Sequence, residues 1–550
     1  MEQSFLEQFE QSFKQNWDRP ALSDYKSATL HYKDVARRIA KLHILFEECG
    51  VNKGDKIAIC GRNQANWGVV FLATLTYGAV AVPILHEFKP DNIHHIVNHS
   101  EARILFVGDM VWETINERSM TALEAIIIIG DFSVVYSRRP SIRAARERLN
   151  ELFGKKYPKN FRPEHIAYHH DEPDELAVIN YTSGTTGFSK GVMLAYRSIL
   201  SNLLFARAVI DLKVGDNVVS MLPMAHMYGM MFEFIFEMAN GANVHLLTRA
   251  PTPKIIMEAF AEIKPTIIIS VPLIVEKIYK KQLQPLLNKT SVKMLLKLPV
   301  IDVQIKKKIL TALNQVFGNN FFEVIIGGAA FNREAELFFK KIGFRYTVGY
   351  GMTECAPIVT YDDWDKTPLY SCGKAVPRME VKIDSPDPEH IPGEILARGA
   401  NVMLGYYRNE QATTDAFTPD GWLKTGDLAV MDKDGYVYIK GRNKSMILGS
   451  SGQNIYPEEL EDVINNMPYV SESLVVQHGE KLLALVYPDY DETTAAGFLD
   501  ADIPNIMEEM RVKVNEELPN YAQIAQVKIY PEEFEKTPKR SIKRFLYQKV

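Results

Sequence analysis

A short segment rich in glycine and hydroxyl side chains, Tyr181–Gly191 (YTSGTTGFSKG), has the composition of a phosphate-binding loop. Its hydroxyl, glycine and cationic residues are Ser183, Thr185, Thr186, Ser189, Gly184, Gly187, Gly191 and Lys190. Backbone amides freed by glycine, hydroxyl donors and one cation together suit a polyphosphate. The GxxxxGKS/T spacing of the Walker A loop is absent, so the segment predicts a phosphate site of another kind. The alternative is a polar surface turn.

Polar residues suited to nucleotide and metal binding recur further along the chain. They lie in Leu222–Gly229 (LPMAHMYG), Gly327–Ala330 (GGAA), Tyr350–Glu354 (YGMTE), Trp422–Asp427 (WLKTGD) and Gly441–Lys444 (GRNK). An ionised carboxylate only accepts hydrogen bonds, so Asp427 suits the two hydroxyls of a ribose, to which Arg442 can also donate. Glu354 offers the hard oxygen ligands that Mg²⁺ prefers. Taken singly, such an aspartate is usually a turn residue, and a lone histidine such as His226 usually a core residue.

These segments and their order resemble the AMP-forming acyl-adenylating superfamily, most closely its long-chain fatty acid–CoA ligases. The superfamily includes acyl-CoA synthetases, peptide-synthetase adenylation domains and luciferases. The resemblance runs from about Ala21 to Arg544, nearly the whole chain. Several motifs in one order are far more specific than any one of them.

The resemblance implies a binding role for each matching residue. The residues implied to contact ATP are Thr182, Ser183, Gly184, Thr185, Thr186, Gly187, Gly327, Gly328, Ala329, Tyr350, Gly351, Met352, Thr353, Asp427 and Arg442. The glycines of the Gly327 segment let the adenine ring approach the backbone closely.

The resemblance also implies catalytic roles and a reaction. Lys190 and Thr353 are implied to act on the phosphates, Glu354 to bind Mg²⁺, and His226 to border the acyl site. A carboxylate is expected to attack ATP, giving an acyl-adenylate and pyrophosphate, and coenzyme A then to displace AMP. Such catalysis is mainly orientation and neutralisation of charge.

One lysine that the family pattern K-T-P-x-G-K-I-x-R contains is missing. The segment Lys536–Arg544 reads KTPKRSIKR, which places Ser541 at that position. A serine carries no charge, but Lys539 and Lys543 lie two residues to either side, on the same face of an extended segment. We therefore predict that Lys543 or Lys539 is the catalytic substitute. The alternative is that both are solvated basic residues.

Two features favour a fatty acid as the substrate. Lys264–Tyr279 and Leu448–Glu459 resemble segments of long-chain acyl-CoA synthetases. Met221–Met238 is rich in Met and Phe, which suit an apolar tunnel, although ordinary core is the alternative for most of them. We predict a medium- or long-chain acid and CoA. An acyl-carrier protein as acceptor, an aryl acid, and a non-catalytic adenylate-binding protein stay open as alternatives.

These residues need a scaffold of alternating strands and helices. The N-terminal pattern predicts helices over Tyr32–Cys49, Asn63–Tyr77 and Asp91–Asn98 and strands over Lys56–Cys60, Ala79–Pro83, Ile104–Val107, Ile126–Ile129, Leu176–Ile179 and Thr266–Val271. Such alternation predicts parallel α/β layers. The uncharged run Trp67–Leu85 is near the length of a membrane span, but Gly78 and Pro83 favour a buried helix followed by a strand.

Short strands separated by Gly, Pro and Asp predict a β-rich subdomain after Tyr370. Its strands are expected over Val381–Asp384, Gly393–Arg398, Leu428–Met431 and Gly435–Lys440. We predict a large α/β N-terminal domain, residues 1–441, with two α/β subdomains and this β-rich one. A small mobile α+β domain, residues 442–550, is expected to follow, with Lys444 at the hinge that the resemblance implies.

Composition excludes some classes of partner and location. The 550 residues are 46% hydrophobic and 24% charged with a formal net charge of −5, so no overall field favours nucleic acid. The four cysteines lack metal-ligand spacing, and the N-terminus lacks a signal peptide, so a cytoplasmic protein is expected. A fatty substrate is compatible with weak peripheral membrane contact, although no strong amphipathic anchor is present. The sequence predicts no oligomeric state.

Overall fold

An eight-stranded sheet in the order β20-β9-β8-β4-β3-β5-β6-β7 supports the N-terminal half of the computed structural model. The structure describes residues 3–182, 189–249, 251–280, 299–448, 453–479, 481–536 and 542–548. The strands are β3 (Lys56–Cys60), β4 (Val80–Ile84), β5 (Ile104–Val107), β6 (Ala125–Ile128), β7 (Val134–Ser137), β8 (Leu176–Thr182), β9 (Lys190–Ala195) and β20 (Gly405–Tyr406). The strands from β8 to β6 are parallel, as predicted, and β7 and β9 add antiparallel neighbours.

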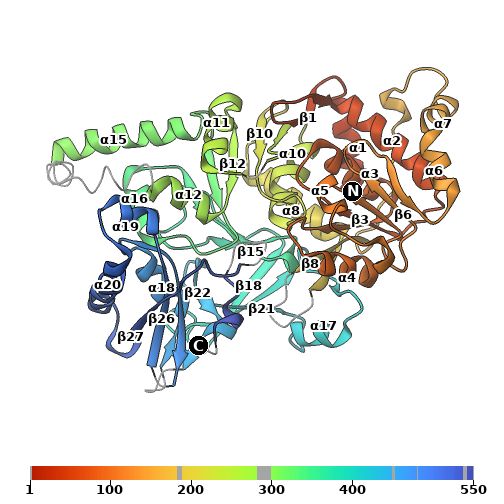
Figure 1. The fold of residues 1–550 in the computed structure, drawn as a ribbon. Helices are drawn as coiled ribbons and strands as arrows, with labels where there is room; N and C mark the ends of the chain where they lie inside the picture. The colour runs from red at the N-terminus through yellow and green to blue at the C-terminus, as the bar shows by residue number, and fades with distance from the viewer. Residues whose placement is uncertain are drawn as a thin grey trace.

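Helices cover this sheet where the sequence predicts them (Figure 1). They are α2 (Tyr32–Glu48), α3 (Ala65–Tyr77) and α4 (Pro90–Ser100); α3 contacts β3, β4 and α2. The left-handed Gly78 (φ 86°) ends α3, and β4 follows, so Trp67–Leu85 forms the predicted buried helix and strand. Within the described ranges, no helix is long and apolar enough to cross a membrane.

The sequence did not predict the N-terminal helix α1 (Phe5–Gln15). Its residues are polar and mixed in charge, but Phe5, Phe9 and Phe13 lie on one face and are fully buried. The carboxylate of Asp171 accepts hydrogen bonds from the Phe5 and Leu6 amides, at 3.1 and 2.9 Å. A partner more than 160 residues away in the chain therefore fixes this helix end.

Two smaller sheets complete the α/β part. They contain β10 (Asn217–Ser220), β11 (Asn243–Leu246), β1 (Pro20–Asp24) and β2 (Thr29–His31), and β12 (Ile267–Ser270), β13 (Glu323–Ile326) and β14 (Tyr346–Val348). The helices in this part of the chain are α8 (Tyr196–Val209), which contacts β9, and α11 (Pro253–Ile263), α12 (Pro272–Ile278), α15 (Pro299–Val316) and α16 (Arg333–Ile342). In Figure 1, α15 extends outward from the rest of the molecule.

The predicted β-rich part is present and has a small core of its own. It is built from β15 (Tyr350–Gly351), β16 (Ile358–Tyr361), β17 (Lys374–Ala375), β18 (Met379–Asp384), β19 (Gly393–Gly399), β21 (Leu423–Met431) and β22 (Val437–Arg442), with α17 (Glu410–Ala416) beside it. Side chains of Ile383, Ile395, Ala429 and Val437 pack in that core. The strands form two sheets, β15-β16-β17 and β18-β19-β21-β22, and all strand pairs in them are antiparallel.

The C-terminal segment forms a mixed sheet with helices, as predicted. It contains β25 (Val470–His478), β26 (Lys481–Pro488), β27 (Ile524–Ile529), α18 (Pro457–Asn465) and α20 (Ile503–Glu517). Its buried residues form two clusters separate from the main core, which ends at Leu423. Shorter elements are α5 (Asp109–Trp112), α6 (Pro140–Glu147), α7 (Leu149–Lys156), α19 (Tyr490–Ala495), β23 (Ile447–Leu448) and β24 (Asn454–Ile455).

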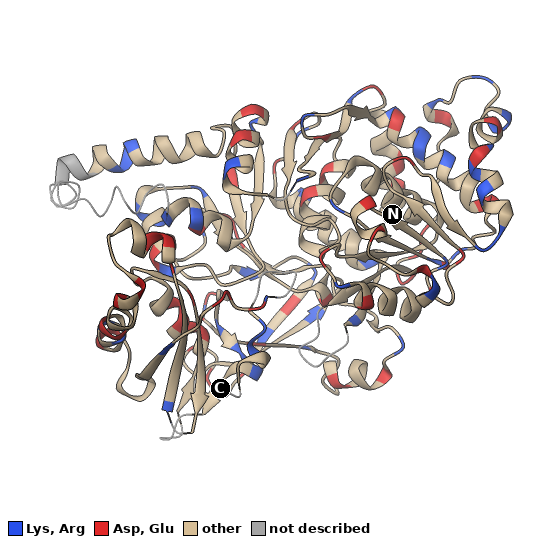
Figure 2. Ribbon diagram, viewed as in Figure 1, with Lys and Arg blue, Asp and Glu red and all other residues tan. Residues whose placement is uncertain are grey.

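Charged side chains are interspersed over the molecule. Figure 2 shows lysine and arginine mixed with aspartate and glutamate on both the α/β part and the C-terminal segment. The four cysteines, Cys49, Cys60, Cys355 and Cys372, are buried free thiols. Burial raises the pKa of the Cys49 thiol to about 11 and of the Cys372 thiol to about 12, so both stay protonated near neutral pH.

Candidate active site

The register of β21 and β22 brings Asp427 and Arg442 together. They face each other across the two antiparallel strands, and Arg442 Nε lies 3.4 Å from Asp427 Oδ1. The Tyr350 hydroxyl donates to Asp427 Oδ2 at 2.6 Å. Burial raises the pKa of Asp427, and Arg442 and the Tyr350 hydroxyl act in the opposite direction. The three residues, far apart in the sequence, form one polar group suited to a diol.

Tyr406 connects Lys190 with Glu354. Its hydroxyl donates to Glu354 Oε1 at 2.9 Å, and Lys190 Nζ lies 4.3 Å from the centre of its ring. Burial and the Glu354 carboxylate raise the pKa of Tyr406, so the hydroxyl keeps its proton and donates. The β20 strand places Tyr406 here because it pairs with β9, the strand that begins at Lys190. The Lys190 ammonium group and the Glu354 carboxylate therefore both contact Tyr406.

The predicted phosphate loop connects β8 and β9 of the eight-stranded sheet. Thr182 ends β8 and faces Lys190, which begins β9, across an antiparallel pair. The predicted residues Ser183, Gly184, Thr185, Thr186 and Gly187 lie outside the described residues. The loop therefore begins and ends beside the Lys190–Tyr406–Glu354 group.

The Gly327 segment directly follows the parallel strand β13. The Gly327 amide donates to the Ser270 carbonyl at 3.1 Å, and a methyl group at Gly327 would lie 3.1 Å from the Tyr228 ring. Gly328 adopts a left-handed conformation, φ 89°, and both it and Ala329 are exposed. The segment therefore presents exposed backbone, with Tyr228 packed beneath Gly327.

The turn that carries Thr353 and Glu354 leaves no room for a side chain at Gly351. Gly351 pairs with Ile358, and a methyl group on it would lie 2.4 Å from the Pro357 carbonyl oxygen. The Met352 amide donates to that same oxygen at 2.8 Å. Thr353 is buried and opens the short 3₁₀ turn that includes Glu354.

His226 begins the short helix α9 (Met227–Met230), where its Nδ1 accepts from the Tyr228 amide at 3.2 Å. The preceding carbonyl, of Ala225, accepts from the Asn180 side chain at 3.0 Å. Asn180 is on β8, two residues before Thr182. The segment that carries His226 is thus attached to the strand that leads into the predicted phosphate loop.

The C-terminal lysines lie in the small mixed domain. Lys543 forms an ion pair with Glu535, and Lys536 with Glu472. Lys539 and Ser541 lie outside the described residues. Lys444, the predicted hinge, is exposed in a 3₁₀ turn immediately after β22.

The sequence identified neither Tyr406 nor Tyr228, which join the predicted residues in space. The only local sign was the Gly405-Tyr406-Tyr407 sequence, and nothing in it indicates contact with Glu354 or Lys190.

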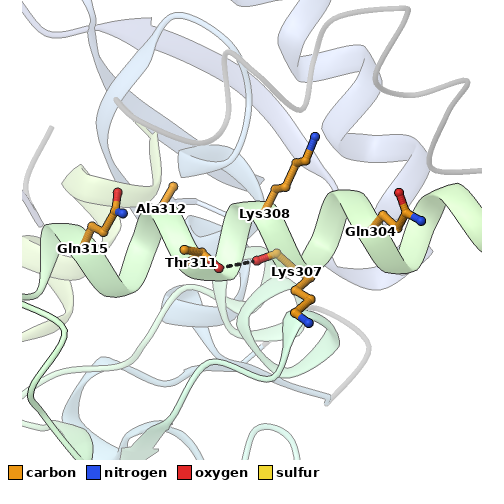
Figure 3. A pocket seen from close by; sticks show the side chains of 6 residues that line it. All are labelled: Gln304, Lys307, Lys308, Thr311, Ala312 and Gln315. Carbon is orange, nitrogen blue, oxygen red and sulfur yellow. Dashed lines mark hydrogen bonds between the residues drawn. The ribbon is translucent and has the colours of Figure 1, made fainter.

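A surface hollow of about 420 Å³ lies elsewhere, along α15. Its lining, Gln304, Lys307, Lys308, Thr311, Ala312 and Gln315, comes from that one helix and includes none of the predicted site residues (Figure 3).

A single carboxylate at Glu354 is a suitable donor set for Mg²⁺ bound together with a nucleotide. Magnesium usually takes one or two carboxylates, keeps waters, and uses phosphate oxygens for the rest. Tyr406 occupies one oxygen of Glu354. Within the described residues, no group of three or more His, Cys, Asp and Glu side chains forms a metal cage of its own.

Comparison with known proteins gives consistent matches. The model of the family described as AMP-binding enzyme matches residues 9–407. A long-chain-fatty-acid–CoA ligase, FadD15, of Mycobacterium bovis is 30% identical over 472 residues, 80% of this chain and 74% of its own. The long-chain-fatty-acid–CoA ligase of Escherichia coli O157:H7 is 30% identical over 504 residues, 86% and 83% of the two chains.

Solved structures share the fold over nearly the full length. The anthranilate CoA ligase AuaEII in complex with anthranoyl-AMP superposes with a TM-score of 0.80 at 19% identity, covering 99% of this chain and 96% of that one. ATP-bound MatB from Rhodopseudomonas palustris gives a TM-score of 0.75 at 21% identity, covering 98% of each chain. At 19% and 21% identity, this structural similarity shows a shared fold alone.

Proposed function

The chain belongs to the AMP-binding enzyme family, and from that premise we propose that it joins a fatty acid to coenzyme A through an acyl-adenylate. The family and the two long-chain ligase relatives support an AMP-forming acid–CoA ligase. The observation that carries the proposal is the presence of two polar groups, Asp427 with Arg442 and Tyr350, and Glu354 with Tyr406 and Lys190. The Asp427 and Glu354 carboxylates interact electrostatically, which links the two groups.

ATP is proposed to bind across these two groups. Asp427 and Arg442 hold the ribose, and the segment Gly327–Ala329, whose Gly328 and Ala329 are exposed, lies against adenine. The hydroxyls and amides of the phosphate loop, with Lys190, hold the phosphates. Bound at Glu354, Mg²⁺ would neutralise phosphate charge.

The first half-reaction is attack of a carboxylate oxygen on the α-phosphorus of ATP. A bond forms between these atoms, and pyrophosphate leaves with the electrons of the broken P–O bond. Lys190 and the Thr353 hydroxyl are proposed to stabilise the charge on the phosphate oxygens, which is catalysis by fixed electrostatics. His226 borders the acid.

The second half-reaction converts the mixed anhydride to a thioester. The CoA thiolate attacks the acyl carbon, and AMP leaves with the electrons of the broken C–O bond. We propose that the C-terminal domain, residues 442–550, turns about Lys444 between the two steps. The separate hydrophobic clusters of this segment support its movement as a unit.

Support for a fatty acid comes from the relatives and from the buried Met and Phe side chains between Met221 and Met238. The test uses purified protein with ATP, Mg²⁺ and acids from acetate to oleate, with and without CoA, and measures AMP and pyrophosphate. CoA-dependent AMP with medium- or long-chain acids is expected. Acid-dependent ATP–pyrophosphate exchange without CoA turnover would indicate another acceptor, and turnover only with aryl acids would overturn the fatty substrate.

A variant that removes one site group shows whether the activity belongs to this protein. Glu354→Gln keeps the size of the side chain and an acceptor for Tyr406 but removes the charge proposed to hold Mg²⁺. Adenylate formation should fall in Glu354→Gln and remain in Glu380→Gln, a substitution at an exposed position on β18. Equal activity in wild type and Glu354→Gln would remove Glu354 from the proposal.

A further inference from the structure

The loop that carries His226, Met221–His226, is held by buried side chains from three different parts of the chain. Asn63 Nδ2 donates to the Leu222 carbonyl at 2.7 Å, and Asn63 Oδ1 accepts from the Met224 amide at 2.9 Å. Asn180 Nδ2 donates to the Ala225 carbonyl at 3.0 Å. The loop is therefore fixed by specific hydrogen bonds as well as by packing.

The third holder is Glu233, which is fully buried. Its Oε2 accepts from the amides of Met221 and Leu222, at 3.0 and 2.8 Å. These are the first two amides of the loop. The next residue, Pro223, has no N–H and needs no acceptor. A buried amide without an acceptor is costly, so these two depend on this one side chain.

Glu233 lies in a π-helical turn, Met231–Ile235, between α9 and α10 (Phe236–Ala239). Such turns are rare and are frequently found at functional sites. This one occurs directly after the His226 segment, and its glutamate contacts the beginning of the same loop.

We propose that Glu233 is a positioning residue of the acid site, which fixes the His226 loop through the Met221 and Leu222 amides. The inference rests on the proposed function for its effect on the acid. It assigns Glu233 no contact with substrate. Loss of the acceptor should therefore weaken binding of the acid more than binding of ATP. The residues proposed to hold the nucleotide, Asp427, Arg442 and Tyr350, lie in the β-rich part, away from this loop in the chain.

The useful group on Glu233 is an oxygen acceptor, with or without a charge. Burial raises the pKa of Glu233, and the two amide hydrogen bonds oppose that rise. A glutamine offers the same carbonyl oxygen, so Glu233→Gln should preserve the loop and Glu233→Leu should not.

Glu237 is a matched control on the adjoining helix. It is fully buried, four residues after Glu233, and its carboxylate oxygens have no hydrogen-bond partner in the described part of the chain. Glu237→Leu therefore removes an equally buried carboxyl group that does not hold the loop.

The experiment compares wild type with Glu233→Leu, Glu233→Gln and Glu237→Leu in adenylate formation, with acid and ATP varied separately. Glu233→Leu should raise KM for the acid roughly fivefold or more, with KM for ATP changed less than about twofold. Glu233→Gln should restore the wild-type KM, and Glu237→Leu should leave it unchanged. Equal effects of Glu233→Leu and Glu237→Leu, or equal changes in both KM values, would overturn the inference.

Hydrogen exchange separates this inference from the proposed function. In Glu233→Leu the Met221 and Leu222 amides should exchange about tenfold faster or more, whereas Glu233→Gln and Glu237→Leu should retain wild-type protection. If no acid is adenylated, the proposed function fails and this measurement still decides the inference. Unchanged protection in Glu233→Leu would overturn it whatever the activity.

Discussion

Asp427 has a mostly buried carboxylate, and its partners, Tyr350 and Arg442, come from two separate segments. We expect Asp427→Asn to weaken ATP binding about tenfold or more, because hydrogen bonds to a charged group contribute about 1.5–3 kcal/mol. Isothermal titration with ATP measures this change. Tyr350→Phe removes one donor and keeps the carboxylate, so its effect should be smaller. An Asp427→Asn affinity equal to wild type would contradict the ribose assignment.

The missing lysine at Ser541 gives a second prediction at this scale. We expect either Lys543→Ala or Lys539→Ala to slow acyl-adenylate formation at least about tenfold, since a buried or substrate-facing charge contributes that much. Lys543 pairs with Glu535, so it has to exchange this partner for the substrate before it can act. Lys536→Ala, whose lysine pairs with Glu472, is the matched control. If both alanine variants adenylate at the wild-type rate, the substitution hypothesis fails and the two lysines are solvated surface residues.

The sequence could identify the residues that are predicted to bind the ligand directly. Asp427, Arg442, Glu354 and Lys190 follow from motif and chemistry, and the structure places them in two groups. Tyr406 could not be identified, because its role arises from β20 pairing with β9, more than 200 residues earlier. Glu233 was equally hidden, since a helical glutamate with acceptor bonds to backbone amides has no pattern in sequence.

At the scale of elements, the β15–β16 turn depends on the absence of a side chain at Gly351. Gly351→Ala should destabilise the protein by about 1–3 kcal/mol, because the new methyl group would meet the Pro357 carbonyl and the turn must shift. Thr353 and Glu354 would move with it, so adenylation should fall too. Thermal unfolding measures the loss of stability, and acid-dependent ATP–pyrophosphate exchange measures the loss of adenylation.

Gly154 provides the control for that substitution. It lies within α7, and a methyl group there would meet nothing within 4 Å. Gly154→Ala should be neutral or stabilise by about 0.5–1 kcal/mol, since alanine favours a helix more than glycine does. If Gly351→Ala were as stable and active as Gly154→Ala, the turn would not be as tight as the geometry indicates.

Helix α16 contains a carboxyl group that should make stability depend on pH. Burial raises the pKa of Glu336 to about 7, and the Tyr370 amide, Arg333 and Lys340 oppose the rise. Between its ordinary value near 4.5 and about 7, the folded protein holds a proton that the unfolded chain has released. The contribution of Glu336 to stability is therefore fully present below that window and is lost as pH rises through it.

Glu336→Gln should remove this dependence. Over the window, the slope of the free energy of unfolding against pH should become less negative by up to about 1.4 kcal/mol per pH unit, the limit for one proton. Urea unfolding from pH 4.5 to 8 measures the slope. Glu334→Gln, an exposed position on the same helix, should keep the wild-type slope. Identical slopes in all three proteins would show that Glu336 titrates normally.

The elements with a clear period or a continuous apolar run could be predicted to within a few residues. Helix α2 and strands β3 and β5 were of this kind. The helix α1 was missed because its residues are mostly polar and mixed in charge, although Ser4 and Glu7 form a capping box at its start and Phe5, Phe9 and Phe13 recur on one face. The π-helical turn at Met231–Ile235 was also hidden, since one extra residue in a helix leaves no local signal.

At the scale of the whole molecule, polar contacts join the C-terminal segment to the α/β part and to the β-rich part. Glu459 of α18 pairs with Arg333 at 3.5 Å and with Lys440 at 3.3 Å, and Lys280 donates to the Asn465 carbonyl at 2.8 Å. Partly exposed ion pairs contribute only about 0–1 kcal/mol each, so such contacts can be exchanged easily. A polar interface of this kind suits a domain that alternates between two positions.

Lys444 is where that movement can be tested. It lies in an exposed 3₁₀ turn, a conformation whose usual φ, about −50 to −70°, overlaps that of proline. Lys444→Pro should keep this arrangement and remove rotation about the backbone N–Cα bond. One half-reaction should then slow about tenfold or more while the other is spared, as measured by acyl-AMP formation without CoA and by thioester formation from added acyl-AMP.

Lys444→Ala removes the side chain and leaves the backbone free, so both half-reactions should remain near the wild-type rate. If proline slowed both steps equally, or neither, the rotation would occur elsewhere or would not be needed. Selective loss in Lys444→Pro alone would place the hinge at this residue, because only the backbone freedom differs between the two variants.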